Sequence, residues 1–214
     1  MKNVDDLIAS AGQLAERGLS RGEIADELNV SRETASWLVE RSDTGRTVAA
    51  EPDDGREASG PDDIHVDWST IGRDSARLGH VAEAMSDLLS KQGDAVDLTV
   101  GIEKAGAPLA TSVAYGIDTD LATYTPAKHQ WDDGDMDDLG GSFSRNFATI
   151  RGRDCYIVDD TITSGTTMRE TVEAIRAEGG NPVACCVVVD KQGVESIDGV
   201  PVYSLITVVR VGDD

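Results

Sequence analysis

The chain has 214 residues and a formal net charge of −21, from 19 Lys and Arg against 40 Asp and Glu. This length allows one large domain or two small ones, and the charge excludes binding of nucleic acid through a broad basic surface. The chain has 27 Asp against 13 Glu and 14 Arg against 5 Lys. This asymmetry indicates a halophilic cytoplasm, where surface carboxylates keep a protein soluble. An ordinary acidic protein is the alternative.

The cysteines Cys155, Cys185 and Cys186 lie in apolar runs and form no CxxC pair. Neither a disulfide framework nor a direct metal site is indicated, and we expect buried thiols. Residues 1–10 lack the apolar core of a signal peptide, and no stretch is long enough to cross a membrane. We therefore expect a cytoplasmic protein without membrane contact.

Composition divides the chain into three regions. Residues 1–42 have apolar residues at helical spacing and predict a small all-α domain. Residues 43–63 are rich in Pro, Gly and charge and predict a flexible linker. Residues 64–214 alternate helical and strand patterns, which predicts an α/β domain with a mostly parallel sheet. Its expected helices are 78–89, 107–117 and 166–180, and its expected strands are 96–102, 120–126, 155–160, 182–190 and 201–208.

Residues 20–41 have the pattern of a helix-turn-helix. Ser20 and Glu23 can form a capping box at the start of the first helix. Asn29 lies where the turn needs a positive φ, and Ser31 can cap the second helix. This order of residue types is typical of the DNA-reading motif, so we expect the N-terminal domain to bind DNA.

The second helix of this motif would present its first turn and outer face to DNA. Arg32 could grip phosphate or read guanine, and Thr34 could reach bases or phosphate. The residues expected at this interface are Ser31, Arg32, Glu33, Thr34 and Ser36. A basic field is not required in molar salt, because the Debye length is then ~3 Å. A helical module that binds another protein is the alternative.

Residues 155–167, CYIVDDTITSGTT, join a strand, two acids and a Thr/Ser/Gly loop that opens a helix. Backbone N–H groups and hydroxyls in such a loop form an anion site suited to a phosphate monoester, and Gly165 permits close approach. Asp159 and Asp160 lie at the end of the strand, where ligands bind in open α/β sheets. Their carboxylates can accept hydrogen bonds from sugar hydroxyls, so a ribose 5-phosphate fits.

This string resembles the phosphoribosyl diphosphate (PRPP) signature of the type I phosphoribosyltransferases. Residues 101–117 resemble the diphosphate loop of the orotate phosphoribosyltransferases, and residues 187–193 are similar to their late strand near the nucleobase. The resemblance implies the type I phosphoribosyltransferase fold, a homodimer, and PRPP with its Mg²⁺ as ligand, with no organic cofactor. It implies ribose contacts from Asp159 and Asp160. The other ligand contacts that it implies are Thr163, Ser164, Gly165, Thr166 and Thr167 for the 5-phosphate, Glu103, Lys104, Ala105 and Gly106 for the diphosphate, and Lys191 near the nucleobase.

The sequence departs from the orotate enzymes at three places. Ala105 stands where they have a lysine, and Lys191 stands where they have an arginine, whose planar contacts a lysine cannot reproduce. Residues 126–141, which match their catalytic loop, keep Lys128 and His129 as the candidate catalytic residues but add five aspartates. These carboxylates would oppose a departing diphosphate, which cations stabilise. Acidic adaptation of the surface to salt is the alternative explanation.

A helix-turn-helix joined to a phosphoribosyltransferase-like domain is the architecture of a metabolite-sensing transcription regulator. The whole chain resembles haloarchaeal regulators of sugar metabolism, which themselves resemble orotate phosphoribosyltransferases. The resemblance implies promoter DNA as a partner, PRPP or a related phosphorylated metabolite as the effector, and no enzymatic activity. The alternative is an active phosphoribosyltransferase of the orotate or purine type, which transfers ribose 5-phosphate from PRPP to a nucleobase.

Overall fold

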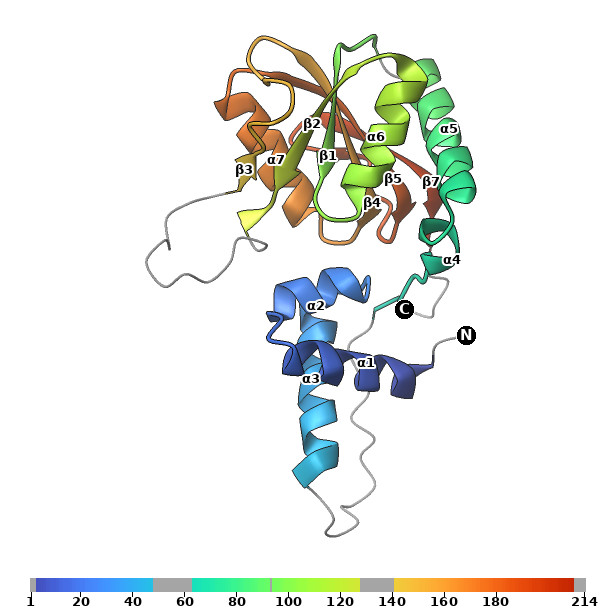
Figure 1. Cartoon of the computed structure of the whole chain (residues 1–214), viewed down its shortest axis with the longest axis vertical. Coiled ribbons are helices and arrows are strands. Elements are labelled where there is room, and N and C mark those ends of the chain that lie inside the picture. Colours follow the sequence, from blue (N-terminus) through green and yellow to red (C-terminus); the bar gives the residue numbers. More distant parts are fainter. Residues whose placement is uncertain (1–2, 48–62, 93, 128–140, 210–214) are drawn as a thin grey trace. The chain divides into compact units, whose positions relative to one another are not determined.

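The chain forms two compact units, Met1–Trp68 and Ser69–Asp214, which we call the helical unit and the sheet unit (Figure 1). The computed structural model describes residues 3–47, 63–92, 94–127 and 141–209. The sequence alone predicts that the second domain starts at residue 64, whereas Asp63, His65 and Val66 hydrogen-bond to residues 28–34 of the helical unit. No described helix is long and apolar enough to cross a membrane.

Three helices form the helical unit: α1 (Val4–Glu16), α2 (Arg21–Glu27) and α3 (Arg32–Thr47). The predicted capping box of α2 is confirmed, with Ser20 and Glu23 each accepting from the other's backbone N–H. Asn29 has the predicted positive φ, at 51°, and the Ser31 hydroxyl accepts from the backbone of the first turn of α3 over 3.1 Å. The core comprises Leu7, Ala11, Leu14, Ile24, Ala25, Leu28, Val30, Ala35, Leu38 and Val39.

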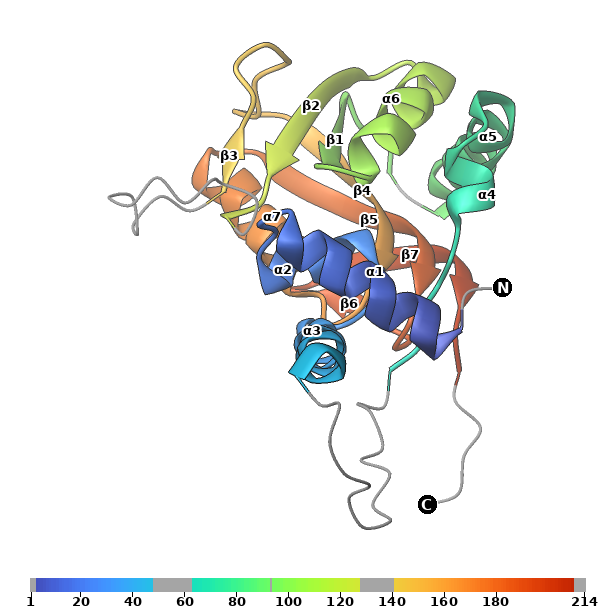
Figure 2. The ribbon, with the colours of Figure 1, turned by 60° about the horizontal axis from the view of Figure 1, so that its bottom comes forward.

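The sheet unit contains one seven-stranded sheet in the order β3-β2-β1-β4-β5-β7-β6 (Figure 2). The strands are β1 (Leu98–Ile102), β2 (Asp120–Thr125), β3 (Ser142–Phe143), β4 (Asp154–Ile162), β5 (Asn181–Asp190), β6 (Ser196–Ile197) and β7 (Val200–Thr207). The helices are α4 (Ser69–Gly72), α5 (Ser75–Gln92), α6 (Gly106–Ile117) and α7 (Thr166–Ala177). The five long strands run parallel, and β3 and β6 add antiparallel edges.

All eight elements that the sequence predicted in this unit are confirmed, with ends shifted by a few residues. The elements α4, β3 and β6 are not predicted by the sequence pattern. Each has only two to four residues, which is too short for an apolar period to show. The prediction of a mostly parallel sheet is confirmed, since both antiparallel strands lie at its edges.

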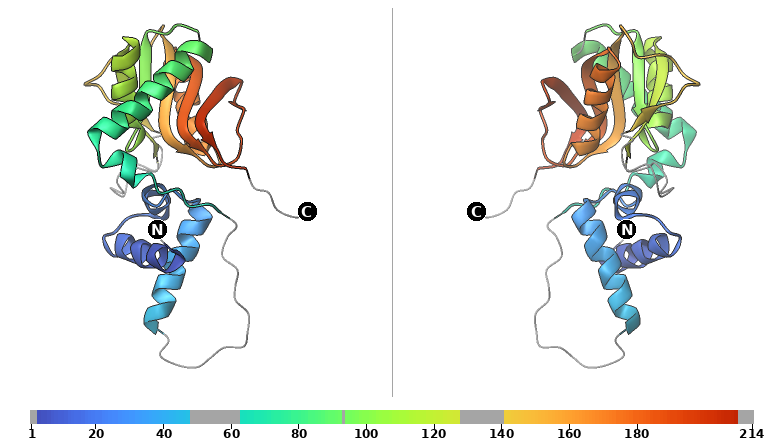
Figure 3. Two further views of the ribbon diagram at one scale, coloured as in Figure 1. Left: turned by 90° about the vertical axis from the view of Figure 1, so that its right-hand side faces the viewer. Right: turned by 90° about the vertical axis from the view of Figure 1, so that its left-hand side faces the viewer.

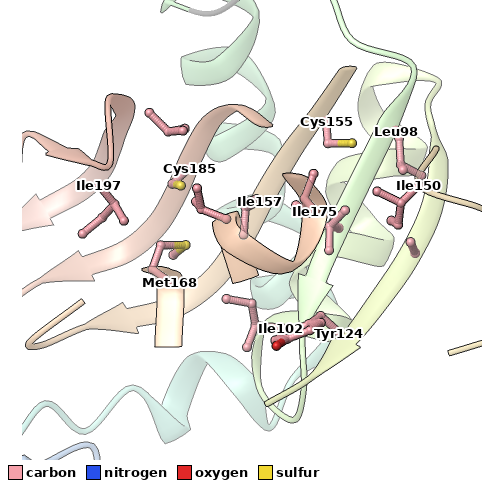
Figure 4. Packing of buried hydrophobic residues seen from close by; sticks show 14 of the residues in the cluster. Leu98, Ile102, Tyr124, Ile150, Cys155, Ile157, Met168, Ile175, Cys185 and Ile197 are labelled. Atoms are coloured by element: carbon pink, nitrogen blue, oxygen red, sulfur yellow. The ribbon is translucent and has the colours of Figure 1, made fainter. Parts of the chain in front are cut away.

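Helices cover both faces of the sheet. Figure 3 shows α5 and α6 on one face and α7 on the other. The layer beneath α7 is apolar, with Ile157 of β4, Cys185 of β5 and Ile175 of α7 all fully buried (Figure 4). The three thiols are buried as predicted, and burial raises the pKa of Cys155 and Cys186 to about 12. Strands buried on both faces read as continuous apolar runs, which is why the sequence revealed them.

The strand order reverses between β1 and β4. The chain leaves β1 through α6 toward β2 on one side, and leaves β4 through α7 toward β5 on the other. Strands β1 and β4 are paired in parallel up to Gly101 and Val158, so their carboxyl ends lie at one edge of the sheet. Ligands of open α/β proteins bind at such a switch point. The fold therefore brings the loops after β1 and β4 to one place.

Candidate functional site

The loop at residues 163–167 joins β4 to α7. Gly165 has the left-handed φ of 73° and is the N-cap residue, and no side chain caps the helix. Ser164 and Thr166 are exposed, and their hydroxyl oxygens lie 3.0 Å apart. Thr163 and Thr167 are half-buried. A helix N-terminus without a side-chain cap presents its N–H groups and positive dipole end to an anion.

The two acids before this loop differ in their surroundings. Asp160 is buried, with 8% of its surface exposed, whereas Asp159 is half-buried. Asp159 Oδ1 accepts from the Asp160 N–H over 2.9 Å. Adjacent strand residues point to opposite faces, so the two carboxylates are not equivalent, although the sequence analysis gave both the ribose hydroxyls.

The loop at residues 103–106 joins β1 to α6. A Cβ added to Gly106 would lie 2.6 Å from the Val158 carbonyl oxygen and 2.9 Å from Asp159 Oδ1. Only glycine therefore fits here, and the two predicted halves of the ligand site touch. Helix α6, like α7, has no side-chain cap, since its N-cap residue is Ala105. Asp159 therefore lies beside the start of α6 and on the strand that leads into α7, and both helices begin without a side-chain cap.

The predicted diphosphate residues have different positions. Lys104 is exposed and Ala105 is half-buried. The Glu103 carboxylate accepts from the Thr125 hydroxyl over 2.8 Å, and the Glu103 N–H donates to the Tyr124 carbonyl. Glu103 therefore ties the loop to β2.

Lys191 follows β5, the strand next to β4. It is 7% exposed, and its N–H donates to the Ile162 carbonyl over 3.1 Å. The preceding Asp190 carboxylate accepts from the backbone N–H groups of residues 192–194. Lys191 therefore lies at the same sheet edge as the ligand loops, one strand away. Among the described residues, no group of three or more His, Cys, Asp and Glu could hold a metal ion.

Lys128 and His129 lie outside the described residues. The chain on either side of that segment meets Glu170 of α7. Glu170 Oε1 accepts from the Ala127 N–H over 2.8 Å and from the Tyr124 hydroxyl over 2.9 Å, and burial together with Glu170 raises the pKa of Tyr124. A Cβ added to Gly141 would lie 2.6 Å from Glu170 Oε1. The helix of the phosphate loop thus contacts the end of β2.

The predicted DNA-contacting residues lie at the start of α3. Arg32 and Glu33 are exposed, and Ser31 and Ser36 are half-buried. Thr34 is 9% exposed, because its hydroxyl is within 2.8 Å of the Ser31 hydroxyl and donates to Asp63 over 2.9 Å. The start of α3 thus has two exposed charged residues, Arg32 and Glu33. The hydroxyls of Ser31 and Thr34 contact each other, and Asp63 accepts from that of Thr34.

Residues 67–209 match the family of the phosphoribosyl transferase domain. The transcriptional regulator GfcR of Haloquadratum walsbyi is 70% identical, over 100% of this chain and 96% of that protein, and GfcR of Haloferax volcanii is 68% identical over both full lengths. The chain belongs to the GfcR family of transcriptional regulators. These haloarchaeal relatives support the halophilic origin inferred from composition. A GfcR of Methanosarcina mazei is 43% identical over 99% of this chain and 100% of that protein.

Solved phosphoribosyltransferases share the fold of the sheet unit. Adenine phosphoribosyltransferase of Thermoanaerobacter pseudethanolicus has a TM-score of 0.55 and 17% identity, covering 71% of this chain and 92% of that one. Orotate phosphoribosyltransferase of Mycobacterium tuberculosis, in complex with PRPP, has a TM-score of 0.53 and 18% identity, covering 66% and 80%. The predicted type I phosphoribosyltransferase fold is therefore confirmed for this GfcR-family chain.

Sequence reasoning missed three residues of this GfcR-family chain. Glu170 and Tyr124 join α7 to β2 across 46 positions, and Asp63 contacts α3 from a distance of about 30 positions. No local pattern marks such pairs, because helix and strand periodicities report only on neighbours along the chain.

Proposed function

We propose that the protein is a DNA-binding transcription regulator of central sugar metabolism, whose phosphoribosyltransferase-like domain senses PRPP or a related phosphorylated metabolite. The observation that carries the proposal is the pair of uncapped helix N-termini beside Asp159, in a chain that also has the α2–α3 pair. The name of the GfcR relatives supports the regulatory half.

The proposed sensing of PRPP depends on hydrogen-bond donors for its phosphate groups and on a carboxylate for its ribose. Two helix N-termini would supply N–H groups for two phosphate groups, and Asp159, beside the start of α6 and on the strand before α7, would accept from ribose hydroxyls. Donors for two anions, with an acceptor for sugar hydroxyls nearby, suit a ribose that carries a phosphate group at each end. Mg²⁺ would reach this site with PRPP, held by its phosphate groups, because Mg²⁺ favours oxygen ligands and is often bound together with substrate phosphates.

The proposed binding of DNA depends on helix α3. Arg32 is exposed in its first turn, where the reading helix of this motif meets bases and phosphates. Dimerisation through the sheet unit would present two such helices to half-sites about one helical turn, ~34 Å, apart. The ligand alters DNA affinity only to the extent that it favours one dimer geometry over another.

An active phosphoribosyltransferase is the second candidate, and the complete motif at residues 155–167 favours it. Release of diphosphate from PRPP, assayed with orotate and the purine bases, separates the two. We expect no turnover above background. Robust turnover with any base would contradict a purely regulatory role.

The central test measures DNA and PRPP binding in molar KCl. We expect wild-type protein to retard its own promoter DNA and Arg32→Ala to bind it about tenfold more weakly, as the loss of a base or phosphate contact of 1–3 kcal/mol implies. Arg17→Ala, which removes an exposed charge at the end of α1, is the matched control. Equal DNA binding by wild type and Arg32→Ala would overturn the assignment of α3.

For the ligand, Asp159→Asn should lower PRPP affinity by roughly tenfold or more, because hydrogen bonds to charged groups contribute about 1.5–3 kcal/mol. Asp118→Asn is the control, since Asp118 is the C-cap residue at the other end of α6. Unchanged PRPP affinity in Asp159→Asn would contradict the proposed site. Sequencing the DNA that the protein occupies in cells tests the sugar-metabolism assignment.

A further inference from the structure

The segment Asp63–Val66 lies against the turn between α2 and α3. The Asn29 side-chain amide donates to the Val66 carbonyl over 3.1 Å, and the His65 ring contacts the Leu28 carbonyl through Nδ1. All four residues of the segment are half-buried. This segment comprises the last residue of the expected linker and the first three of the expected second domain, and it is held on the helical unit; we call it the Asp63–Val66 strap.

The strap places a negative charge on the start of α3. One Asp63 carboxylate oxygen accepts from the Ser31 N–H over 2.5 Å and from the Thr34 hydroxyl over 2.9 Å. The other oxygen accepts from the Ile64 N–H over 2.7 Å. Asp63 thus binds donors at the positive end of the helix dipole, where anions are stabilised.

DNA would require the same donors. Phosphate oxygens accept hydrogen bonds from backbone N–H groups, hydroxyls and helix N-termini at protein–DNA interfaces. While Asp63 binds Ser31 and Thr34, a phosphate that approaches this turn meets a carboxylate instead of donors. Molar salt does not remove this effect, because charges in contact lie within the Debye length of ~3 Å.

We propose that Asp63 is an internal substitute for a DNA phosphate, and that the Asp63–Val66 strap must leave the start of α3 for tight DNA binding. This inference rests on the proposed role of α3 in binding DNA. The strap continues after two residues, Asp67 and Trp68, into the sheet unit at Ser69. Only two residues of chain therefore separate the strap from the unit to which we assign the ligand.

The test measures affinity for promoter DNA in the full-length protein over a series of KCl concentrations. Asp63→Asn removes the charge but keeps a side-chain oxygen that can accept from Ser31. We expect DNA affinity to rise roughly tenfold, and the slope of log K against log [KCl] to steepen by about 0.9 for one added phosphate contact. Asp5→Asn, which removes an exposed charge of α1, should change neither quantity.

A second variant leaves Asp63 unchanged. His65→Ala removes the ring contact with Leu28, so it should weaken the strap and raise DNA affinity by a smaller factor, about threefold. Melting curves confirm that each variant is folded. A structural role for Asp63 in orienting α3 predicts the opposite sign, a loss of DNA affinity.

The outcomes separate the inference from the function beneath it. If wild type binds DNA and neither strap variant binds it more tightly, the strap inference is wrong and the DNA-binding role stands. If no variant binds DNA, both fail. Binding by Asp63→Asn in KCl concentrations at which wild type does not bind supports both.

Discussion

The helices that begin at the two candidate binding sites differ in how their first N–H groups are satisfied. In the helical unit, Ser20 caps α2 and Ser31 caps α3, and Asp63 adds a carboxylate at the start of α3. In the sheet unit, α6 and α7 begin at the ligand edge without side-chain caps. At a helix start without a side-chain cap, the first N–H groups can be satisfied by water or by a bound anion. The sheet unit thus has the donors to which we assign an external anion, whereas an internal carboxylate, that of Asp63, occupies donors at the start of α3.

The largest expected effect is a loss of PRPP affinity when the backbone at the N-terminus of α7 is distorted. Gly165→Ala forces a φ of 73° on a residue with a side chain and brings its Cβ to 2.7 Å from Ile197. Backbone strain of this kind costs about 1–3 kcal/mol, and either the Ile197 side chain or the loop must shift to relieve the contact. We expect PRPP affinity, measured by calorimetry, to fall by at least about tenfold.

Gly152→Ala is the matched control for that substitution. Gly152 has nearly the same φ, 74°, and an added Cβ would have nothing within 4 Å. This variant should lose only the stability that strain removes, about 1–2 kcal/mol, and keep its PRPP affinity. If both variants bound PRPP as wild type does, the phosphate site would not lie at α7.

A second pair of substitutions tests the capping difference itself. Ser31→Ala removes the side-chain cap of α3 and should lower the free energy of unfolding by about 0.5–2 kcal/mol. Ser164→Ala, on the loop before α7, should leave it almost unchanged, because Ser164 caps no helix. Urea denaturation measures both. An equal loss in the two variants would remove the distinction between capped and uncapped helices.

The sequence predicts contacts between residues that are close together in the chain, and it does not predict contacts between distant residues. Three predicted features involve residues close together in the chain: the capping box of Ser20 and Glu23, the turn at Asn29 and the loop with Gly165. Their sequence patterns can therefore be recognised. Asp63 closes its contact across about 30 residues. Such contacts depend on the packed fold, and no spacing in the sequence encodes them.

The smallest expected effect is on the pH dependence of stability, which should differ between the two units. All cysteines and all tyrosines lie in the sheet unit, and burial raises the pKa of Cys186 from 9.0 to about 12. The folded state therefore binds a proton that the unfolded state releases above pH 9. This stabilising contribution is complete below pH 9 and decreases as the pH rises toward 12.

Cys186→Ala isolates that contribution. Between pH 8 and pH 10 the stability of wild type relative to Cys186→Ala should fall by about 1 kcal/mol, the amount that proton linkage gives for one buried thiol. Denaturation curves at several pH values measure it. In a Trp131→Phe background the remaining tryptophans, Trp37 and Trp68, report on the helical unit, and tyrosine fluorescence reports on the sheet unit. The helical unit contains no thiol, so its unfolding should not change between wild type and the variant at any of these pH values. A pH-independent difference in the sheet unit would mean that the Cys186 thiol already reaches solvent in the folded protein.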